Sequence, residues 1–412
     1  MKIIRRLTAV LLAALFLSAC ACAGAEGSYR PIIAAGGSFI YARDDQGKVY
    51  CWGHNGFGQL GRGNRTQKNR AIYEFESKTP GLDVLQIRDI VCGCDYSYFL
   101  MNDGSIYGVG TGSNGQYLDK GGTQTVHVRL SFKDPTIVQL ATGYGHTLAL
   151  NEAGEVYAWG RNHAGQVGNG SHKGPVREAY RVKLPRIIDI GCCGCHSAAV
   201  DEDGNLWMWG DNSYHQISPA RDKYFMSPVK IDLGGIKVRE VELGGHHTAI
   251  VDVDGNLYMW GRNTACQIGV DLGRKTKTFV DTVTKLDLPL PVKTVDCYGA
   301  LTWVVLEDGS LWTWGLNTYG QMAVGFNTGG ESGLPLSHGE LEFKGQKYSS
   351  KVLDSGVAAI TIGDCFGAAL LEDGTLLTCG INKYGQLGRD APYRGKTNFI
   401  LTAADLRLMG GK

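Results

Sequence analysis

The chain has 412 residues, with 41 basic and 40 acidic residues and a formal net charge of +1 at pH 7. This balance gives no field of one sign and therefore argues against a nucleic-acid partner or binding to an anionic surface. Hydrophobic residues make up 43% of the chain, which excludes a disordered protein. The 59 glycines and 11 prolines favour many tight turns between short strands.

Residues 1–20 are expected to be an export signal. Basic residues at positions 2, 5 and 6 precede an apolar run, 7–19, that is too short for a membrane-spanning helix of about 20 residues. The run ends in LSAC at 17–20, which resembles the bacterial lipoprotein box and would place a lipid on Cys20. Cleavage of an ordinary secretory signal after Ala25 is the alternative. Either route exports the chain, which is lipid-anchored at the outer face of the cell membrane or secreted, with residues 21–30 as a short tether.

The rest of the chain, 31–412, repeats one unit seven times. The clearest copy is WGRNHAGQVG, from Trp159 to Gly168, and its tryptophan slot recurs at intervals of 57, 50, 50, 51, 54 and 65 residues. A period near 50 with strand-like content predicts one four-stranded sheet per repeat. In the third copy, for example, strands are expected at 137–141, 147–150 and 155–159, with more strand at 180–184. The expected repeats are 31–82, 83–136, 137–186, 187–237, 238–291, 292–357 and 358–412.

A glycine marks the same hairpin turn in every copy. These turn residues are Gly47, Gly104, Gly154, Gly204, Gly255, Gly309 and Gly374. Five of them follow an aspartate, and Asp-Gly between apolar runs predicts a type I′ hairpin. Eight residues before each glycine lies a position that we call the histidine slot. It is filled by Phe39, Tyr96, His146, His196, His247, Leu301 and Phe366.

Two loops and the chain ends complete the expected organisation. The first and last intervals are lengthened at 62–81 and 325–350, which we expect to be polar surface loops. Seven radial sheets must close into a ring. We expect the closure to pair residues 28–33 with residues 398–406.

Taken together, the motifs resemble the regulator-of-chromosome-condensation (RCC1-like) repeat family. They are Gly-x-x-His-(Thr/Ser), then Asp-Gly, then Trp-Gly-x-Asn-x-x-Gly-Gln-(Leu/Ile/Val)-Gly, and the match runs from about Pro31 to the carboxyl terminus. The resemblance implies an all-β fold, a seven-bladed β-propeller, here as an exported bacterial member. The family includes a nuclear exchange factor for a small GTPase and secreted bacterial propellers that inhibit β-lactamases. The second precedent fits the expected compartment better, but no motif carries its activity over.

The repeated polar residues of the turn are expected to be structural. A glutamine occupies one position in all seven copies and an asparagine another in six, where their amides would satisfy backbone groups left unpaired by a tight loop. The tryptophans are expected to pack between blades. His146, His196 and His247 occupy one slot in different blades, so we expect each to bond within its own blade instead of sharing a metal.

Seven of the ten cysteines outside the leader lie just before the histidine slot. They are Cys92, Cys94, Cys192, Cys193, Cys195, Cys297 and Cys365. Thiolates and imidazoles are zinc ligands, but the Cys-x-Cys spacing is awkward for chelation. Small buried thiols are the favoured interpretation, with disulfides within the ring and a metal as alternatives. No cofactor or metal is expected.

Variable residues around the histidine slot are the candidate partner-binding site. The candidates are Phe39, Asp95, Tyr96, Tyr144, Cys195, His246, Tyr298, Asp364 and Phe366. An aromatic-rich ring at one end of the channel would suit a protein or glycan partner, whereas aromatics that only fill the channel are the structural alternative.

The favoured function is a monomeric, non-enzymatic binding propeller, because no phosphate loop, nucleophile elbow or catalytic triad is evident. An inhibitor of a secreted enzyme such as a β-lactamase is a narrower alternative. A glycan-active enzyme that uses Asp95 or Asp364 is a weaker one.

Overall fold

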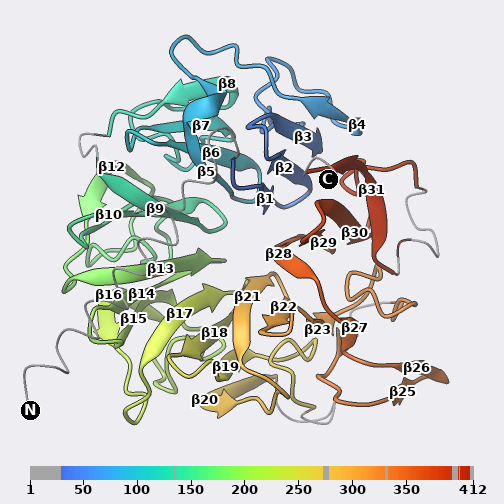
Figure 1. The fold of residues 1–412 in the computed structure, drawn as a ribbon. Helices are drawn as coiled ribbons and strands as arrows, with labels where there is room; N and C mark the ends of the chain where they lie inside the picture. Colours follow the sequence, from blue (N-terminus) through green and yellow to red (C-terminus); the bar gives the residue numbers. More distant parts are fainter. Residues whose placement is uncertain are drawn as a thin grey trace, which may run out of the picture.

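Seven antiparallel sheets are arranged radially around a central channel in the computed structural model (Figure 1). The structure describes residues 29–132, 136–271, 278–329, 333–391, 398 and 400–408, so the expected export signal and Cys20 lie outside the described residues. Each sheet is built from one contiguous stretch of chain and forms one blade. The prediction of an all-β, seven-bladed propeller is therefore confirmed.

The blades share one strand order, from the innermost strand to the outermost. Blade 1 contains β1 (Ile32–Ala35), β2 (Phe39–Arg43), β3 (Val49–Gly53) and β4 (Asn69–Glu74). Blade 2 follows a 3-10 turn, η1 (Val84–Gln86), and contains β5 (Ile87–Cys92), β6 (Tyr96–Met101), β7 (Ile106–Gly110) and β8 (Gln124–Arg129). Blade 3 contains β9 (Ile137–Thr142), β10 (His146–Asn151), β11 (Val156–Gly160) and β12 (Val176–Arg181).

The next two blades keep this plan. Blade 4 contains β13 (Ile187–Cys193), β14 (His196–Asp201), β15 (Leu206–Asp211) and β16 (Tyr224–Lys230). Blade 5 contains β17 (Val238–Leu243), β18 (His247–Asp252), β19 (Leu257–Arg262) and β20 (Phe279–Lys285). The second and third strands of these blades are almost entirely buried and the outermost strands are more exposed, as expected of sheets that are covered on both faces by neighbouring blades.

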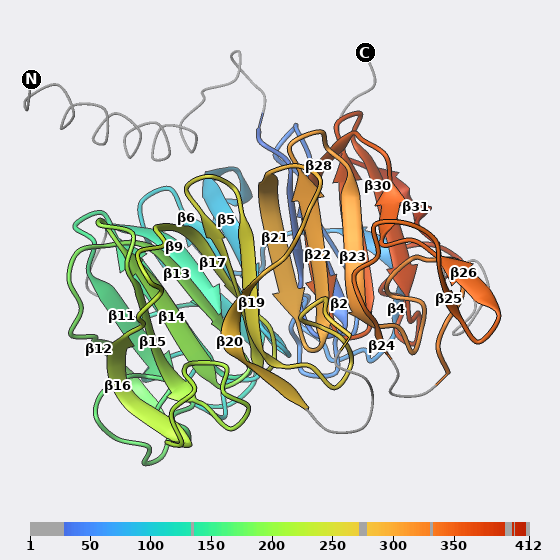
Figure 2. The same ribbon diagram turned by 90° about the horizontal axis from the view of Figure 1, so that it is seen from below.

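Blade 6 departs from the plan at its outer edge. It contains β21 (Val292–Tyr298), β22 (Leu301–Leu306) and β23 (Leu311–Leu316), and β23 pairs with two short strands, β24 (Gly333–Leu334) and β27 (Lys351–Leu353). Between these two strands, β25 (Leu341–Phe343) and β26 (Gln346–Tyr348) form a separate hairpin that projects from the ring (Figure 2). The expectation of a plain surface loop at 325–350 is therefore wrong.

Blade 7 shows that the ring is not closed by exchanged strands. It contains β28 (Val357–Gly363), β29 (Phe366–Leu371), β30 (Thr375–Gly380) and β31 (Thr402–Arg407), while β1 pairs only with β2. The expected pairing of 28–33 with 398–406 is wrong. The seam is held by contacts between complete blades, including Ala35 N to Thr361 Oγ1 at 2.9 Å and Asp45 N to Leu408 O at 2.9 Å.

The hairpin turns use a different geometry from the expected type I′ turn. All seven turn glycines have positive φ, between 75° and 83°, but none of the preceding aspartates does. At Gly104, the glycine N–H donates to Met101 O and Met101 N–H donates to Ser105 O. This pattern is a type I turn followed by a glycine bulge, the arrangement typical of three-residue hairpin loops.

The hydrophobic core lies between neighbouring blades. Each hydrophobic cluster of the described residues combines side chains of adjacent sheets, and the slot tryptophans 52, 159, 209, 260 and 314 are almost completely buried. Trp159 Nε1 donates to Gln116 O at 2.9 Å, and Trp209 Nε1 to Gln166 O at 2.9 Å. All five tryptophans fill an interface between blades, as the packing prediction requires. Four of them, Trp52, Trp159, Trp209 and Trp314, also donate to the turn of the preceding blade, whereas Trp260 Nε1 has no hydrogen-bond partner among the described residues.

Candidate functional site

The repeated turn is a framework that satisfies its own backbone. The side-chain oxygen of each turn glutamine accepts the N–H two residues earlier in all seven blades, as Gln166 Oε1 does from Ala164 N at 2.9 Å. Each of the six asparagines accepts the N–H five residues later, as Asn162 Oδ1 does from Val167 N at 3.0 Å. These bonds confirm the structural interpretation of both amides.

Two of the three histidines in the slot link neighbouring blades, which corrects the expectation of bonds within a blade, and neither ring nitrogen of His196 has a hydrogen-bond partner among the described residues. His146 Nε2 lies 3.0 Å from Ser197 Oγ, and His247 Nε2 lies 3.2 Å from Thr302 Oγ1, in each case on the next blade. Tyr96 fills the same slot, and its hydroxyl donates to carbonyls of blade 3. Burial lowers the pKa of His146, His196 and His247 to about 3, so these rings are neutral parts of the interior.

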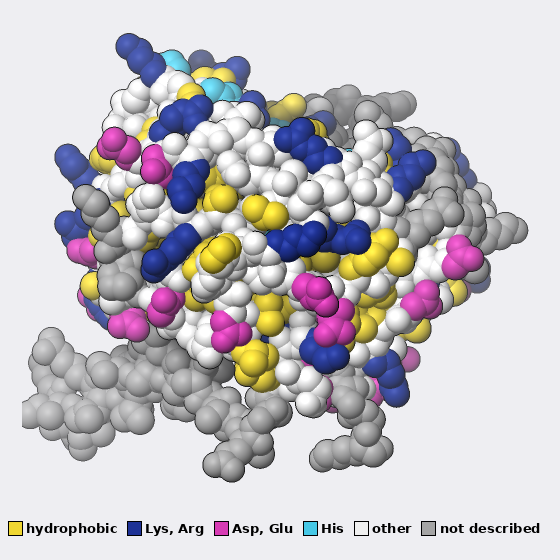
Figure 3. All heavy atoms as spheres, turned by 90° about the horizontal axis from the view of Figure 1, so that it is seen from above, with side chains coloured by type: hydrophobic (Ala, Val, Ile, Leu, Met, Phe, Trp, Pro, Cys, Tyr) yellow, Lys and Arg dark blue, Asp and Glu magenta, His cyan; other side chains and the backbone are white. Residues whose placement is uncertain are grey.

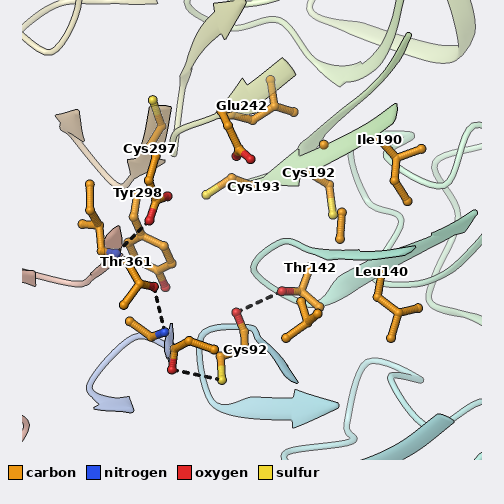
Figure 4. A pocket seen from close by; sticks show the side chains of 18 of the residues that line it. Cys92, Leu140, Thr142, Ile190, Cys192, Cys193, Glu242, Cys297, Tyr298 and Thr361 are labelled. Atoms are coloured by element: carbon orange, nitrogen blue, oxygen red, sulfur yellow. Dashed lines mark hydrogen bonds between the residues drawn. The ribbon is translucent and has the colours of Figure 1, made fainter. Parts of the chain in front are cut away.

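The inner strands of all seven blades line a central cavity of about 250 Å³ (Figure 4). Carboxylates on these strands cap backbone groups of the next blade. Asp189 Oδ2 accepts Val241 N at 3.0 Å, and Asp296 Oδ2 accepts Ile362 N at 2.9 Å. Burial raises the pKa of Asp189 and of Asp296 to about 7. These acids therefore bind the free edges of the inner strands, which lack a neighbouring strand.

Cysteines also line the cavity. Cys92, Cys192, Cys193 and Cys297 surround it, and burial raises the pKa of each thiol. Within the described part of the chain, none of the ten cysteines forms a disulfide. The described residues also contain no group of three or more histidine, cysteine or acidic side chains placed to hold a metal ion. A thiol is a weak nucleophile when burial keeps it protonated, so these cysteines act as small packing residues.

Three of the predicted site residues are inaccessible. Phe39, Tyr96 and Phe366 are 0% exposed, and their rings pack beneath the glycines that precede them by three positions. They support the end of the channel from inside the blades. Direct contact between these side chains and a partner is excluded by their burial.

The other predicted residues reach one end of the propeller. The loop between the first and second strand of each blade and the turn after the third strand emerge on the same side, which we call the variable-loop face. Tyr144 and Tyr298 are partly buried there, with ring centroids 6.0 Å apart, and Tyr298 lines the cavity. The Asp-Gly hairpins and the links between blades emerge on the opposite side, which we call the hairpin face.

A second set of variable residues completes the variable-loop face, and the sequence interpretation missed it. The residue after each Trp-Gly, or its equivalent, donates its N–H to the carbonyl just before the histidine slot in all seven blades. Those residues are His54, Thr111, Arg161, Asp211, Arg262, Leu316 and Ile381. The signal was present, because this position differs in almost every copy within an otherwise regular turn.

Polar side chains meet across blades 3 to 5 on this face. We call the following residues the blade 3–5 cluster: Arg161, His163, Cys195, Asp211, Tyr214, His246 and Arg262. Arg161 Nε donates to His163 Nδ1 at 2.8 Å, and His163 Nε2 lies 3.8 Å from Cys195 Sγ. The cluster thus brings the predicted residue Cys195 against the neighbouring blade.

The rest of the cluster runs from blade 4 to blade 5. Asp211 Oδ2 lies 3.4 Å from His246 Nδ1, and the His246 ring lies 5.0 Å from Tyr214. Arg262 in turn lies 4.8 Å from the Tyr214 ring centroid. Although burial opposes ionisation, the contact with His246 and the hydrogen bonds from Ser213 and Gln216 lower the pKa of Asp211 to about 2. Asp211 is therefore a fixed anion whose charge is satisfied inside the cluster.

The Cys195–His163 pair does not have the arrangement of a catalytic dyad. A general base must accept the thiol proton on a free ring nitrogen. Because Arg161 donates to Nδ1, the neutral ring of His163 carries its proton on Nε2, the nitrogen that faces Cys195. Burial raises the pKa of the Cys195 thiol, and burial together with Arg161 lowers the pKa of His163. Both effects oppose formation of a thiolate–imidazolium pair.

The remaining predicted residues, Asp95 and Asp364, lie on the other side of the same face. Asp95 Oδ1 is 3.8 Å from His54 Nδ1, and the His54 ring is 4.4 Å from that of Tyr384. Asp364 lies on blade 7, where its backbone N–H donates to Gly37 O. The residue is accessible to solvent, but the surrounding protein partly desolvates its carboxyl and so raises its pKa. The structure thus places the two acids near blade 1, apart from the blade 3–5 cluster.

The fold and the site define a propeller with a repeated framework and one chemically varied face. Residues 20–330 match the model of the RCC1-like domain, and residues 357–386 match that of the regulator of chromosome condensation (RCC1) repeat. The chain belongs to this family and is an RCC1-like β-propeller.

Relatives of the chain are diverse. It is 32% identical over 164 residues to the probable E3 ubiquitin-protein ligase HERC6 of Homo sapiens, covering 39% of this chain and 15% of that protein. It is 28% identical over 363 residues to the ultraviolet-B receptor UVR8 of Arabidopsis thaliana, covering 87% of this chain and 66% of the receptor. The chain therefore spans less than two thirds of each of these relatives.

Solved structures show the same fold. Human WBSCR16 superimposes with a TM-score of 0.67 at 21% identity, over 81% of this chain and 84% of that one. Yeast RCC1 (Prp20), solved bound to Kap60, superimposes with a TM-score of 0.66 at 23% identity, over 81% and 78% of the two chains. At these identities the likeness defines the fold and leaves the function to the site.

Proposed function

We propose that this protein is an exported, monomeric, non-enzymatic propeller that captures a protein partner through its variable-loop face. The observation that carries the proposal is the blade 3–5 cluster. It gathers arginine, tyrosine and histidine side chains from three blades on a rigid framework, and arginine and tyrosine are enriched where binding energy concentrates. The formal net charge of +1 gives no field of one sign that would suggest another kind of partner, and basic, acidic and hydrophobic side chains are mixed on the rim of the ring drawn in Figure 3.

The expected lipid at Cys20 would present this face outward. The described chain begins on the hairpin face, where Tyr29 N donates to Asp45 O at 2.8 Å and the Tyr29 ring lies 5.5 Å from the Arg43 guanidinium. From Cys20 to Tyr29 the chain reaches at most about 30 Å. An anchor of that length would keep the hairpin face toward the membrane and leave the variable-loop face open. Among the described residues, no helix is long and apolar enough to span a membrane.

Site-specific photo-crosslinking in intact producing cells tests the proposal. Phe57, 42% exposed on the variable-loop face, and Val253, 62% exposed on the hairpin face, are replaced one at a time by a photo-crosslinking residue. We expect one defined protein to be captured from position 57 and not from position 253. Equal capture from both positions, or capture only from 253, would contradict the proposal. Mass analysis of the mature amino terminus separates lipidation at Cys20 from cleavage after Ala25.

The inhibitor of a secreted enzyme is the narrower version of this function. An inhibitor would use the same variable-loop face. This version predicts that a purified secreted hydrolase binds the propeller and loses activity in proportion to the amount of propeller added. Titration against a panel of β-lactamases checks this version, and unchanged rates across the panel would remove it while leaving partner capture untouched.

A glycan partner, or glycan hydrolysis by Asp95 and Asp364, is the remaining alternative. Glycosidases need two carboxyl groups flanking one bond, with the pKa of one of them raised. Burial raises the pKa of Asp364, which is the one feature in its favour. A screen on cell-wall polysaccharides discriminates, because the enzyme would require activity that Asp95→Asn and Asp364→Asn each abolish.

A further inference from the structure

We propose that Arg161 and Arg262 are the recognition residues of the variable-loop face and bind two carboxylates of an acidic segment in the protein partner. This inference rests on the proposed function and adds the chemistry of the partner to it. The two arginines occupy the same position in blades 3 and 5, immediately after Trp-Gly, on either side of blade 4.

Both guanidinium groups are held in the same manner. Each backbone N–H is fixed to the preceding loop, Arg161 N to Gly145 O and Arg262 N to His246 O, both at 2.8 Å. Each Nε then donates to the side chain two residues later, Arg161 to His163 Nδ1 at 2.8 Å and Arg262 to Thr264 Oγ1 at 2.9 Å. The bond at Nε orients the planar guanidinium group. It leaves the two terminal nitrogens available to donate to the two oxygens of one carboxylate.

Arg161 and Arg262 are not among the lysines and arginines that form ion pairs in the described part of the chain, so their terminal nitrogens have no acidic partner there. The nearby acid, Asp211, is bound by His246, Ser213 and Gln216 instead. Two half-buried cations therefore remain uncompensated on one face. A partner that supplies two carboxylates would satisfy them with charge-assisted bonds.

The surroundings of the arginines reduce the cost of binding. Arg262 lies over the Tyr214 ring, and that ring packs against His246. A guanidinium that is already held by an aromatic ring and a hydrogen bond loses little rotamer freedom when a ligand arrives. The arrangement is therefore preorganised for a carboxylate at blade 5, and the bond to His163 does the same at blade 3.

Two acids on the variable-loop face favour a protein segment over a polyanion. Asp95 and Asp364 lie on the same face near blade 1 and would repel a continuous line of phosphates. The net charge of +1 gives no field to hold a nucleic acid. A short acidic segment needs to contact only the two guanidinium groups, and the rest of the partner can be neutral or basic where it passes Asp95.

Fluorescence anisotropy with labelled peptides tests the inference. The probe carries two glutamates separated by two to six glycine and serine residues, and the control peptide carries glutamines instead. We expect the acidic peptides to bind with a preferred spacing, and Arg161→Gln or Arg262→Gln each to weaken binding at least tenfold. Raising the salt concentration to about 0.5 M should weaken binding further, because exposed charge pairs are screened. Arg181→Gln, on the outer strand of blade 3, should leave it unchanged.

Several results would overturn the inference. They are equal binding of the glutamate and glutamine peptides, unchanged binding by the folded Arg161→Gln/Arg262→Gln double variant, and tighter binding of an oligonucleotide than of the peptides. A doubling of the native mass that the double variant abolishes would instead assign the arginines to a dimer. Crosslinking from position 57 in the double variant separates the two proposals. Unchanged capture removes the role of the arginines and keeps the proposed function, whereas no capture even by the wild type removes the proposed function.

Discussion

The framework turn and the blade 3–5 cluster are neighbours in the chain but differ in how their polar groups are satisfied. Gln166 and Asn162 are buried, and their side-chain oxygens accept backbone N–H groups of their own turn. Arg161, one residue before Asn162, keeps two terminal nitrogens without a partner in the described chain. The difference teaches that one turn serves two purposes. Its inward residues hold the ring together, and its outward residues vary between blades and, in the proposed function, bind the partner.

Replacement of a framework tryptophan should reduce the stability of the fold more than any change in the blade 3–5 cluster. Trp209 is completely buried between blades 3 and 4, and its Nε1 donates to Gln166 O. Trp209→Ala removes the ring and leaves a cavity, so we expect a loss of about 3–5 kcal/mol in the free energy of unfolding. Urea denaturation followed by tryptophan fluorescence measures it. A loss below about 1 kcal/mol would show that the blades do not depend on this interface.

A framework glutamine should have a smaller effect. Gln166→Leu removes the acceptor of Ala164 N and leaves that buried N–H unsatisfied, at a cost of about 1–3 kcal/mol. Urea denaturation of Gln166→Leu beside Gln166→Glu, which retains a side-chain acceptor, isolates the lost hydrogen bond. If both variants were as stable as the wild type, the turn would not depend on its amide.

The buried histidines should make the ring sensitive to acid. Burial lowers the pKa of His247 to about 3 in the folded protein, whereas a histidine in the unfolded chain titrates at about 6.5. Between these two pH values the folded protein therefore binds fewer protons than the unfolded chain. The stability that the neutral ring contributes is full above about pH 6.5 and is lost as the pH falls. His247→Gln removes this titration. Relative to the variant, the wild type should lose about 1.4 kcal/mol per pH unit below pH 6.5, measured by denaturation at pH 7, 6 and 5. A constant difference would contradict a neutral buried ring.

An exposed neighbour of the blade 3–5 cluster should tolerate change. Ser213 is exposed and its hydroxyl donates to Asp211, so Ser213→Ala should alter the free energy of unfolding by at most about 0.5 kcal/mol. The same denaturation assay checks this expectation. A loss comparable to that of Gln166→Leu would mean that the cluster belongs to the framework, which would weaken its assignment as a binding surface.

The repeat predicted the sheets because each strand and turn is fixed by local residues. Gly104 and its equivalents mark every hairpin, and the spacing from glycine to histidine slot never varies. The contacts between blades were harder to predict. The partner of His146 lies 51 residues away on blade 4, and nothing in one repeat indicates whether its ring points into its own blade or the next.

The candidate site was predicted only in part. Tyr144, Cys195 and His246 were found because the loop before the histidine slot varies visibly between copies. Arg161 and Arg262 were missed because they sit inside a motif that was interpreted as pure framework. Phe39 was included because an aromatic in a variable position looks like a binding residue, whereas its burial depends on packing beneath Gly36, which a linear sequence does not show.

The way the ring closes has a consequence for how the protein can be rearranged. Tyr29 N donates to Asp45 O at 2.8 Å, and Asp45 N donates to Leu408 O at 2.9 Å, so both ends of the described chain meet at one hairpin. Among the described strands, every blade is built from one contiguous stretch of the sequence. A circular permutant that joins residues 29 and 408 through a short linker, and opens between blades 3 and 4, would keep every sheet whole. Because each sheet is one contiguous stretch of sequence, a gene for this fold could gain or lose whole blades at its ends without breaking a sheet.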